Sequence, residues 1–323
     1  MLRSMYSGIS GMKNMQIKLD VIGNNIANVN TFGFKKGRIT FKDAMYQTIG
    51  SASEKTDTRG GINAKQVGLG SEIASIDTIH TESSLQNTSR PLDLAITNGD
   101  GYFVVNDGGQ YYFTRAGNFY IDKDGLLVNS DGYRVQMIIN PKNPKNPENA
   151  ENAGNAENAG NAGNAENAEN AGNAENAGNP ENPKNPKNPE TGDITIPKQI
   201  PVEGKSVGLQ SISISQTGEI IAQYENGTVR TIGNIALARF SNAEGLNKAG
   251  GNLFQSSANS GDPQFGIGGG AYGTVVSGKL EMSNVDLSEE FTEMIVAQRG
   301  FQANSRIITT SDEILQELVN LKR

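Results

Sequence analysis

Few side chains in this sequence of 323 residues could perform acid–base, nucleophilic or metal chemistry, and those few are widely spaced. The sequence has no cysteine, and His80 is its one histidine, so thiolate chemistry and a histidine-based metal site are both implausible. Asp93, Asp100 and Asp107 could be imagined as an acid pair. Two of them directly precede glycine, as turn residues do, and no pattern suggests their burial. We therefore predict no catalytic, cofactor or metal site.

One glycine-rich run and two aspartate-containing runs resemble ligand-binding loops only weakly. The run 266–270 lacks the preceding strand and the following helix of a phosphate-binding loop, which favours a linker. The runs 122–125 and 129–132 lack the alternating oxygen ligands and the final Glu of a calcium loop, so we interpret them as turns.

Charge and hydropathy exclude further classes of partner. The net charge is −7, and an acidic chain repels the phosphate backbone, so we expect no nucleic acid partner. No apolar run approaches the roughly 20 residues that a membrane helix needs, so we expect no membrane insertion. Gly8, Gly11, Lys13 and Asn14 interrupt the apolar residues at the N-terminus, which argues against a cleavable signal peptide.

Both ends of the chain show the periodicity of an amphipathic helix, and both stripes are candidate assembly interfaces. Apolar residues recur at gaps of three or four in the first 30 residues, close to a coiled-coil seam. Near the C-terminus, Asp286 and Glu289 form a capping-box pattern before a second stripe. The first stripe holds Leu2, Met5, Ile9, Met12, Met15, Leu19, Ile22, Ile26 and Val29. The second holds Phe291, Ile295, Phe301, Ile308, Leu315, Leu318 and Leu321.

Between the ends, short apolar runs alternate with turn residues, which predicts β-hairpins. The predicted fold is therefore mainly β with α-helical termini, in which the two terminal helices form a coiled-coil pair around an inserted β-rich domain. The expected parts are an N-terminal coiled-coil helix (1–34), an extended connecting segment (35–91), a β-rich outer domain (92–139 and 191–254), a repeat insertion (140–190), a Gly/Ser-rich return segment (255–282) and a C-terminal coiled-coil helix (283–323).

Residues 140–190 consist of 17 triplets that each begin with Asn. The tract holds no aromatic, β-branched or long aliphatic residue, so it cannot bury enough apolar surface to offset its ordering entropy, and we expect disorder. A triplet expansion tolerated in an exposed loop is our favoured interpretation. The alternative is a displayed adhesive tract, which would make the protein a secreted adhesin.

Three separated motifs carry a family resemblance. The first comprises Asn24, Asn25, Ile26, Ala27, Asn28, Thr31, Gly33, Phe34 and Lys35. The second comprises residues 92–96, 101–105 and 112–119, and the third residues 281–287, 294–299 and 312–315. In this order the motifs resemble those of the bacterial flagellar hook and rod axial proteins, and the resemblance covers nearly everything outside the Asn tract.

The resemblance implies that the terminal helices line a narrow export channel and that the β domain forms an outer layer. It implies a helical homopolymer that contacts neighbouring axial proteins of the rod, the hook cap and the hook–filament junction. It also implies export by the flagellar type III apparatus without signal cleavage, location in the hook or basal body, and no enzymatic activity.

Within this family the sequence leaves two members open. The segment 304–321 looks more like a hook protein, which joins rod and filament and transmits motor torque, and we favour that interpretation. The 272 residues outside the tract are closer in length to the distal rod protein, which serves as a drive shaft.

Overall fold

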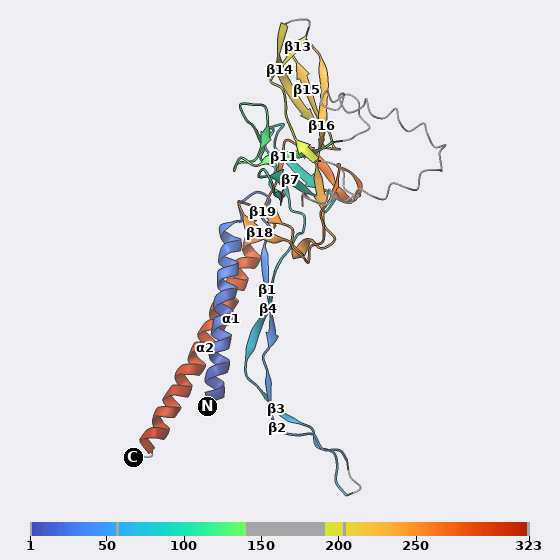
Figure 1. Cartoon of the computed structure of the whole chain (residues 1–323). Helices are drawn as coiled ribbons and strands as arrows, with labels where there is room; N and C mark the ends of the chain where they lie inside the picture. Colours follow the sequence, from blue (N-terminus) through green and yellow to red (C-terminus); the bar gives the residue numbers. More distant parts are fainter. Residues whose placement is uncertain (1, 56–57, 140–190, 203–204, 322–323) are drawn as a thin grey trace, which may run out of the picture. The chain divides into compact units, whose positions relative to one another are not determined.

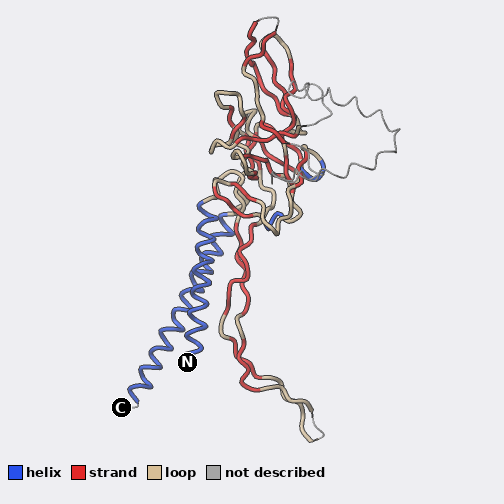
Figure 2. The backbone as a smooth tube through the Cα atoms, in the orientation of Figure 1, coloured by secondary structure: helices blue, strands red, loops and turns tan. Residues whose placement is uncertain are grey.

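The computed structural model describes residues 2–55, 58–139, 191–202 and 205–321. The Asn tract and its expected disorder lie outside these ranges. The chain divides into two compact units: unit 1 comprises residues 1–84 and 282–323, and unit 2 comprises residues 85–281. The long helices belong to unit 1 and most strands to unit 2 (Figures 1 and 2). The mainly β fold with helical termini is thereby confirmed.

Unit 1 contains two long helices, α1 (Leu2–Ala27) and α2 (Leu287–Leu321). Asp286 caps α2, because its Oδ1 accepts hydrogen bonds from the backbone N–H groups of Ser288 at 2.8 Å and Glu289 at 3.4 Å. Glu289 and Glu290 then suit the positive end of the helix dipole. Within the described residues, neither helix combines the length and hydropathy needed to cross a membrane.

Unit 1 also contains a two-stranded ribbon in the segment we expected to be merely extended. The antiparallel pair β1 (Gly37–Asp43) and β4 (Ser71–Thr78) continues as the pair β2 (Tyr46–Gly50) and β3 (Lys65–Gly68). An isolated two-stranded ribbon is marginal in water, so it needs packing from another element. Asn14 of α1 supplies part of this packing, because its side-chain amide donates a hydrogen bond to the carbonyl of Ser71 at 2.9 Å.

Unit 2 is dominated by an antiparallel sheet that has 14 strands in the described residues. Its central path runs in the order β13-β14-β15-β16-β11-β7-β8-β19-β18. The sheet strands are β7 (Tyr102–Asn106), β8 (Tyr111–Thr114), β9 (Tyr120–Ile121), β10 (Leu127–Val128), β11 (Arg134–Ile138), β12 (Thr191–Asp193), β13 (Gln199–Val202), β14 (Lys205–Ile214), β15 (Glu219–Tyr224), β16 (Val229–Ile235), β17 (Leu237–Arg239), β18 (Asn247–Gly250), β19 (Leu253–Gln255) and β20 (Gln264–Gly266). Two short 3₁₀ turns, η3 (Ala243–Gly245) and η4 (Gly270–Tyr272), complete the elements outside the paired strands.

Two clusters of buried side chains on the sheet form most of the core of unit 2. One gathers Phe103, Phe119 and Leu237, and the second gathers Tyr102 and Phe240 with their neighbours. The aromatic rings meet edge to face, as Phe103 and Phe119 do at 5.2 Å between centroids. Consecutive residues of β7 enter the two clusters in turn, so both faces of this strand are buried and unit 2 has its own hydrophobic core.

Residues 255–282, expected as a return segment, instead contribute strands to unit 2. Besides β20, they hold β21 (Thr274–Ser277), which pairs with β6 (Leu94–Thr97), and β22 (Lys279–Glu281), which pairs with β5 (Leu85–Asn87). The glycines that suggested a linker lie between these short strands. Three- and four-residue strands have no recognisable periodicity of their own, because distant partners define them.

Candidate assembly interface

The two helices of unit 1 form an antiparallel pair whose contacts recur every seven residues. Ser4 lies against Ser311, Gly11 against Asn304, and Asn25 against Glu290. Lys18 and Glu293 form an ion pair between them. The residues buried on α2 are Glu290, Ala297 and Ser311, which are also spaced in sevens. This heptad spacing is that of an antiparallel coiled coil, and α1 and α2 run side by side in Figure 1.

Small and polar side chains make much of this seam, which we name the α1–α2 seam. A Cβ atom added to Gly11 would lie 2.6 Å from Nδ2 of Asn304, so glycine allows the close approach there. Gly8 similarly lies against Ile308. A polar Asn in such a seam fixes register at a cost in stability. The seam therefore specifies the pairing more than it stabilises it.

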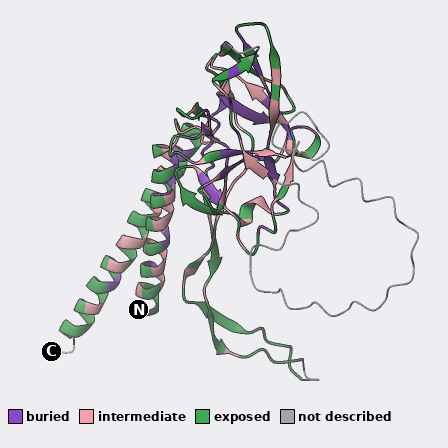
Figure 3. Cartoon of the chain, turned by 45° about the horizontal axis from the view of Figure 1, so that its top comes forward, coloured by how far each residue is buried: buried purple, intermediate pink, exposed green. Residues whose placement is uncertain are grey.

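The predicted apolar stripe of α2 lies largely outside the seam. Phe291 is 49% exposed and Ile295 is 52% exposed, whereas Ile308 packs on Gly8. Phe301, Leu318 and Leu321 are also exposed, and Leu315 is half-buried. Figure 3 shows the resulting exposed residues along the outer side of α2.

The stripe of α1 is better covered. Ile22 is buried, and Ile9 is exposed. The half-buried members are Met5, Met12, Met15, Leu19, Ile26 and Val29. Leu2 begins the helix, and its side chain lies outside the described residues. A helix pair that leaves large apolar side chains in water is typical of a surface made to be covered by another molecule.

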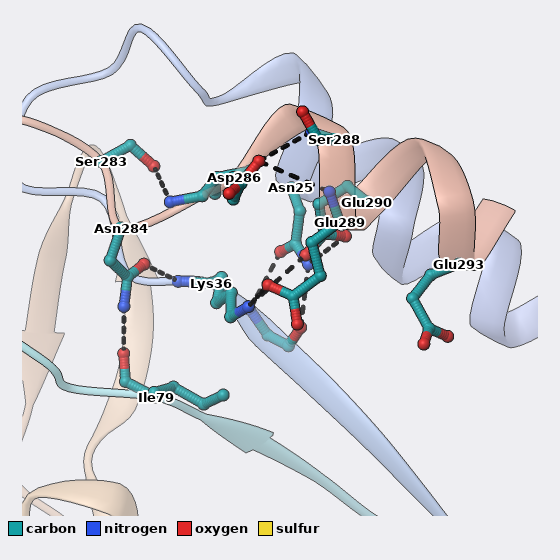
Figure 4. A network of polar contacts seen from close by, with 12 residues as sticks. Asn25, Lys36, Ile79, Ser283, Asn284, Asp286, Ser288, Glu289, Glu290 and Glu293 are labelled. Carbon is teal, nitrogen blue, oxygen red and sulfur yellow. Dashed lines mark hydrogen bonds and ion pairs between the residues drawn. The ribbon is translucent and has the colours of Figure 1, made fainter.

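A second feature joins the C-terminal end of α1, the base of the ribbon and the start of α2, and we name it the polar clasp (Figure 4). Asn25, which is 2% exposed, makes three hydrogen bonds through its side-chain amide. Nδ2 donates to the carbonyl of Gly37 at 2.9 Å and to Oε2 of Glu290 at 3.1 Å. Oδ1 accepts from the backbone N–H of Gly37 at 2.9 Å. Asn25 thereby pairs with Gly37 much as a neighbouring strand would.

Lys36 and Asn284 complete the polar clasp. The Nζ of Lys36 lies 2.8 Å from Oε2 of Glu289 and 3.9 Å from Oε1 of Glu290. The backbone N–H of Lys36 donates to Oδ1 of Asn284 at 2.7 Å, and Nδ2 of Asn284 donates to the carbonyl of Ile79 at 2.8 Å. Residues from both ends of the chain therefore fix where the ribbon begins (Figure 4).

The other motif residues build the turn between α1 and the ribbon. Asn28 donates to the side chain and the carbonyl of exposed Asn24, and Oδ1 of Asn28 accepts from Thr31. Gly33 has φ +69°, which glycine adopts at little cost. Ile26 is half-buried, Ala27 ends α1, Phe34 is buried, and buried Lys35 donates to the carbonyl of Thr81 at 2.7 Å. The motif thus encodes a chain reversal.

The sequence analysis did not predict the small and polar contact residues of either feature. Asn284, Ala297, Asn304 and Ser311 lie in the segments that carry the family resemblance, and Glu290 suits the start of a helix, but none was predicted to make these contacts, because only large apolar residues were considered as interface residues. The sevenfold spacing of 290, 297, 304 and 311 was the available signal.

The residues weighed for catalysis do not come together. Asp93 is buried, and its carboxylate lies 3.2 Å from the guanidinium of Arg90. Asp107 is exposed, and the carboxylate of Asp100 lies 3.9 Å from the guanidinium of half-buried Arg239. Elsewhere in unit 2, Arg115 and Glu281 form a buried ion pair at 3.3 Å. Among the described residues, no group of three or more His, Cys, Asp or Glu side chains could hold a metal ion.

Comparisons with known proteins cover most of the chain. Three family models match: "Flagella basal body rod protein" at residues 5–35, "Flagellar hook protein FlgE/F/G D1 domain" at residues 95–222, and "Flagellar basal body rod FlgEFG protein C-terminal" at residues 276–321. The chain is 48% identical over 325 residues to the flagellar basal-body rod protein FlgG of Bacillus subtilis. It is 37% identical over 442 residues to the flagellar hook protein FlgE of Borreliella burgdorferi. Both alignments cover all of this chain and all of the relative. Among solved structures, the Helicobacter pylori flagellar hook protein FlgE2 aligns with a TM-score of 0.32 and 13% identity, over 62% of this chain and all of that one.

Proposed function

We propose that this chain, which belongs to the family of flagellar hook and basal-body rod proteins, is a structural subunit that polymerises into an axial tube of the flagellum. In this proposal the helices of unit 1 form the inner layer, and unit 2 forms the outer layer. The protein works by transmitting torque and catalyses nothing. The relatives are rod and hook proteins, and they give the adhesin alternative no support.

One observation carries the proposal: the apolar stripe of α2 is exposed while its small and polar residues face α1. A single pair of helices buries too little apolar surface to be stable alone. Many copies packed side by side would cover Phe291, Ile295, Phe301, Leu318 and Leu321, so the stripes we predicted as assembly interfaces would be buried only in the polymer. The polar clasp would hold the ribbon at a fixed angle to each pair.

Removing residues 1–30 tests this proposal directly. The truncated chain should keep a folded unit 2, because the core of unit 2 lies within residues 85–281. It should form no tubes under conditions where the full chain does, as judged by negative-stain electron microscopy. Near-ultraviolet circular dichroism of the tyrosines serves as the folding control. Tubes formed by the truncated chain would refute the proposed role of the helices.

Hook and distal rod remain the two candidates within the family, and each has its own support. Higher identity to the Bacillus rod protein than to the Borreliella hook protein favours the rod. The sequence of residues 304–321 favours the hook. The two roles differ in mechanics: a hook must bend, so its outer contacts must slide, whereas a rod must stay straight.

Immunogold labelling of purified hook–basal bodies separates the two candidates. An epitope inserted between Asn226 and Gly227 lies in an exposed turn between β15 and β16. Gold along the curved external segment would identify the hook, and gold on the straight segment beneath it would identify the distal rod. Absence of label from both, with the tagged chain intact on a blot of the same preparation, would argue against either location.

The same proposal includes the partners and the route of the chain. Neighbouring rod, cap and junction proteins would contact the ends of the tube. Subunits would leave the cell through the flagellar type III export apparatus without signal cleavage. Marginal helices with glycine at positions 8, 11 and 23 suit that route, because they cost little to unfold.

A further inference from the structure

The chain passes between the two units at two peptide bonds, and both lie at the same end of one short strand pair. The first bond follows Ser84 and the second follows Glu281. β5 begins and β22 ends at these points, and Leu85 pairs with Glu281 in their antiparallel register. Within the described residues β5 and β22 form a two-stranded sheet of their own, which we name the stalk. Any pull or twist that the backbone carries from unit 1 therefore enters unit 2 through the stalk.

Only one strand of the stalk is buried. Leu280 and Glu281 of β22 are buried, whereas Gln86 and Asn87 of β5 are exposed. Each strand has three residues, which is about 10 Å at 3.3 Å per residue. A strand pair this short is marginal by itself in water. The direction of the stalk therefore depends on the contacts that fix its two ends to the rest of unit 2.

Backbone hydrogen bonds fix the end of the stalk that is farther from unit 1 along the chain. The N–H of Gly278 donates to the carbonyl of Asp93 at 2.8 Å. The N–H groups of Thr88 and Ser89 donate to the carbonyl of Gly278 at 2.9 and 3.2 Å. Gly278 has φ +76°, which glycine adopts at little cost. With this end alone fixed, the stalk could pivot at the glycine.

A buried ion pair fixes the other end of the stalk. Nη1 of Arg115 lies 3.3 Å from Oε2 of Glu281, and the two residues are 2% and 0% exposed. Nη2 of Arg115 donates to the carbonyl of Gly99 at 2.8 Å. The guanidinium also lies 5.1 Å from the centroid of the Tyr102 ring, which belongs to the core. Arg115 therefore connects the last residue of β22 to a loop and to the aromatic core of unit 2.

Stability alone does not require an ion pair here. Taking two charges out of water costs about as much as their attraction returns, so well-packed apolar side chains of similar volume are often as stable. The two kinds of contact differ when a strand is displaced. Apolar burial is non-directional and depends on the area covered, whereas a hydrogen bond weakens steeply with distance and angle. A hydrogen-bonded ion pair therefore resists small movements that an apolar pair allows.

We propose that Arg115 and Glu281 form a clamp, which stops the stalk from sliding and from pivoting on Gly278. Force that enters unit 2 through the stalk then passes into its core. This inference rests on the proposed transmission of torque, and it names the residues that carry the force from the chain crossing to the sheet.

Single-molecule pulling on the full chain tests the clamp. The chain has no cysteine, so Leu287→Cys and Asn226→Cys give two unique attachment sites at exposed residues of unit 1 and unit 2. Force applied between these sites passes along the backbone through Glu281. The double variant Arg115→Met with Glu281→Leu should shorten the lifetime of the folded stalk at constant force by at least about tenfold. That factor is expected from the loss of a hydrogen bond to a charged group.

Two controls separate a clamp from a general support of unit 2. The melting temperature of the double variant should stay close to that of the unmodified chain, because the apolar pair avoids the cost of burying charges. Attachment at Asn226→Cys and Asp107→Cys, both in exposed turns of unit 2, applies force that does not enter through the stalk. With these sites the lifetimes of the double variant and the unmodified chain should agree within about threefold.

A second variant keeps the test conclusive if the double variant does not fold. Arg115→Lys keeps a positive charge beside Glu281 but lacks the planar fork that also reaches Gly99, so it should shorten the lifetime across the stalk as well.

Two results would overturn the clamp. One is an equal lifetime across the stalk for the variants and the unmodified chain. The other is a lifetime shortened equally with both pairs of attachment sites, because the ion pair would then support unit 2 as a whole. In either case the proposed function stands, since it fails on a different observation: tubes formed by the chain that lacks residues 1–30.

Discussion

Asn25→Asp is the substitution that tests the polar clasp most sharply, because it changes only the amide nitrogen of a buried side chain. The amide nitrogen donates to the carbonyl of Gly37 and to Glu290, and a carboxylate can donate to neither. The change therefore removes two hydrogen bonds and brings a second negative charge about as close to Glu290 as the present 3.1 Å contact.

The expected cost follows from these contacts. Two unit charges 4 Å apart repel by about 4 kcal/mol at an effective dielectric constant of 20. The carbonyl of Gly37 also loses its side-chain donor, which costs about 1–3 kcal/mol if it stays buried. Lys36, whose Nζ lies 3.9 Å from Glu290, offsets part of the repulsion. We expect a loss of about 3–4 kcal/mol at neutral pH.

Hydrogen exchange followed by mass spectrometry on the full chain measures this loss locally. Peptides covering residues 20–43 should exchange roughly a hundredfold faster or more, since 1.4 kcal/mol is a factor of ten. Asn24→Asp is the matched control: Asn24 is exposed and acts as an acceptor for Asn28, so that change should cost at most about 1 kcal/mol, from a charge near the helix C-terminus.

The pH dependence of this stability loss tests whether charge repulsion causes it. Repulsion from Glu290 should raise the folded-state pKa of the introduced carboxyl above its unfolded value. The folded state then binds more protons than the unfolded state, so the stability lost in Asn25→Asp relative to the unmodified chain should shrink as pH falls from 7 toward 4. The reasoning is refuted if the two variants exchange within threefold of each other, or if this loss of stability does not change with pH.

Three further predictions concern other parts of the chain. Glu281→Ala should destabilise unit 2 by about 3–5 kcal/mol, because it removes the carboxylate that pairs with the buried charge of Arg115. The melting temperature measured by circular dichroism should fall by at least about 6 °C. The double variant Arg115→Met with Glu281→Leu should recover most of this lost stability. Gly70→Ala should destabilise the ribbon by about 1–3 kcal/mol, because φ at this position is +126° and an added Cβ atom would lie 2.1 Å from Oγ of Ser10. Hydrogen exchange at residues 37–43 should become faster, and unchanged protection of these amides would refute the prediction. Burial raises the pKa of Tyr102 above its ordinary value of 10.0, with Arg115 opposing, so the stability from its neutral phenol is present below about pH 10 and is lost as pH rises further; absorbance titration should show one tyrosine that ionises only on unfolding and is absent from Tyr102→Phe.

The amino-acid sequence alone determined the features that depend on neighbours along the chain. Helical periodicity gave α1 and α2, and Asp286 gave the capping of α2, because each depends on residues within about one turn. The β-hairpins between the two helical ends were predicted for the same reason: a turn and its two flanking strands are continuous in sequence. The motif from Asn24 to Lys35 indicated the family, since a chain reversal needs particular residues at fixed offsets.

Only the tertiary structure decided which face of each helix is buried. An apolar stripe predicts that a helix will be covered, but it does not say by what. In this chain Gly11 and Asn304 let the backbones of α1 and α2 approach closely, and that contact leaves Phe291 and Ile295 exposed. The sequence search looked for large side chains and so passed over the small ones that make the contact.

The same physical reason explains the strands of residues 264–281 and the polar clasp. β21 and β22 are short, and they pair with β6 and β5 across more than 170 positions of the chain. Asn25 meets Glu290 only because two chain ends come together. Contacts between residues so far apart depend on the whole fold, so local pattern determined the elements of this protein, and long-range packing determined which of their surfaces are left for other molecules.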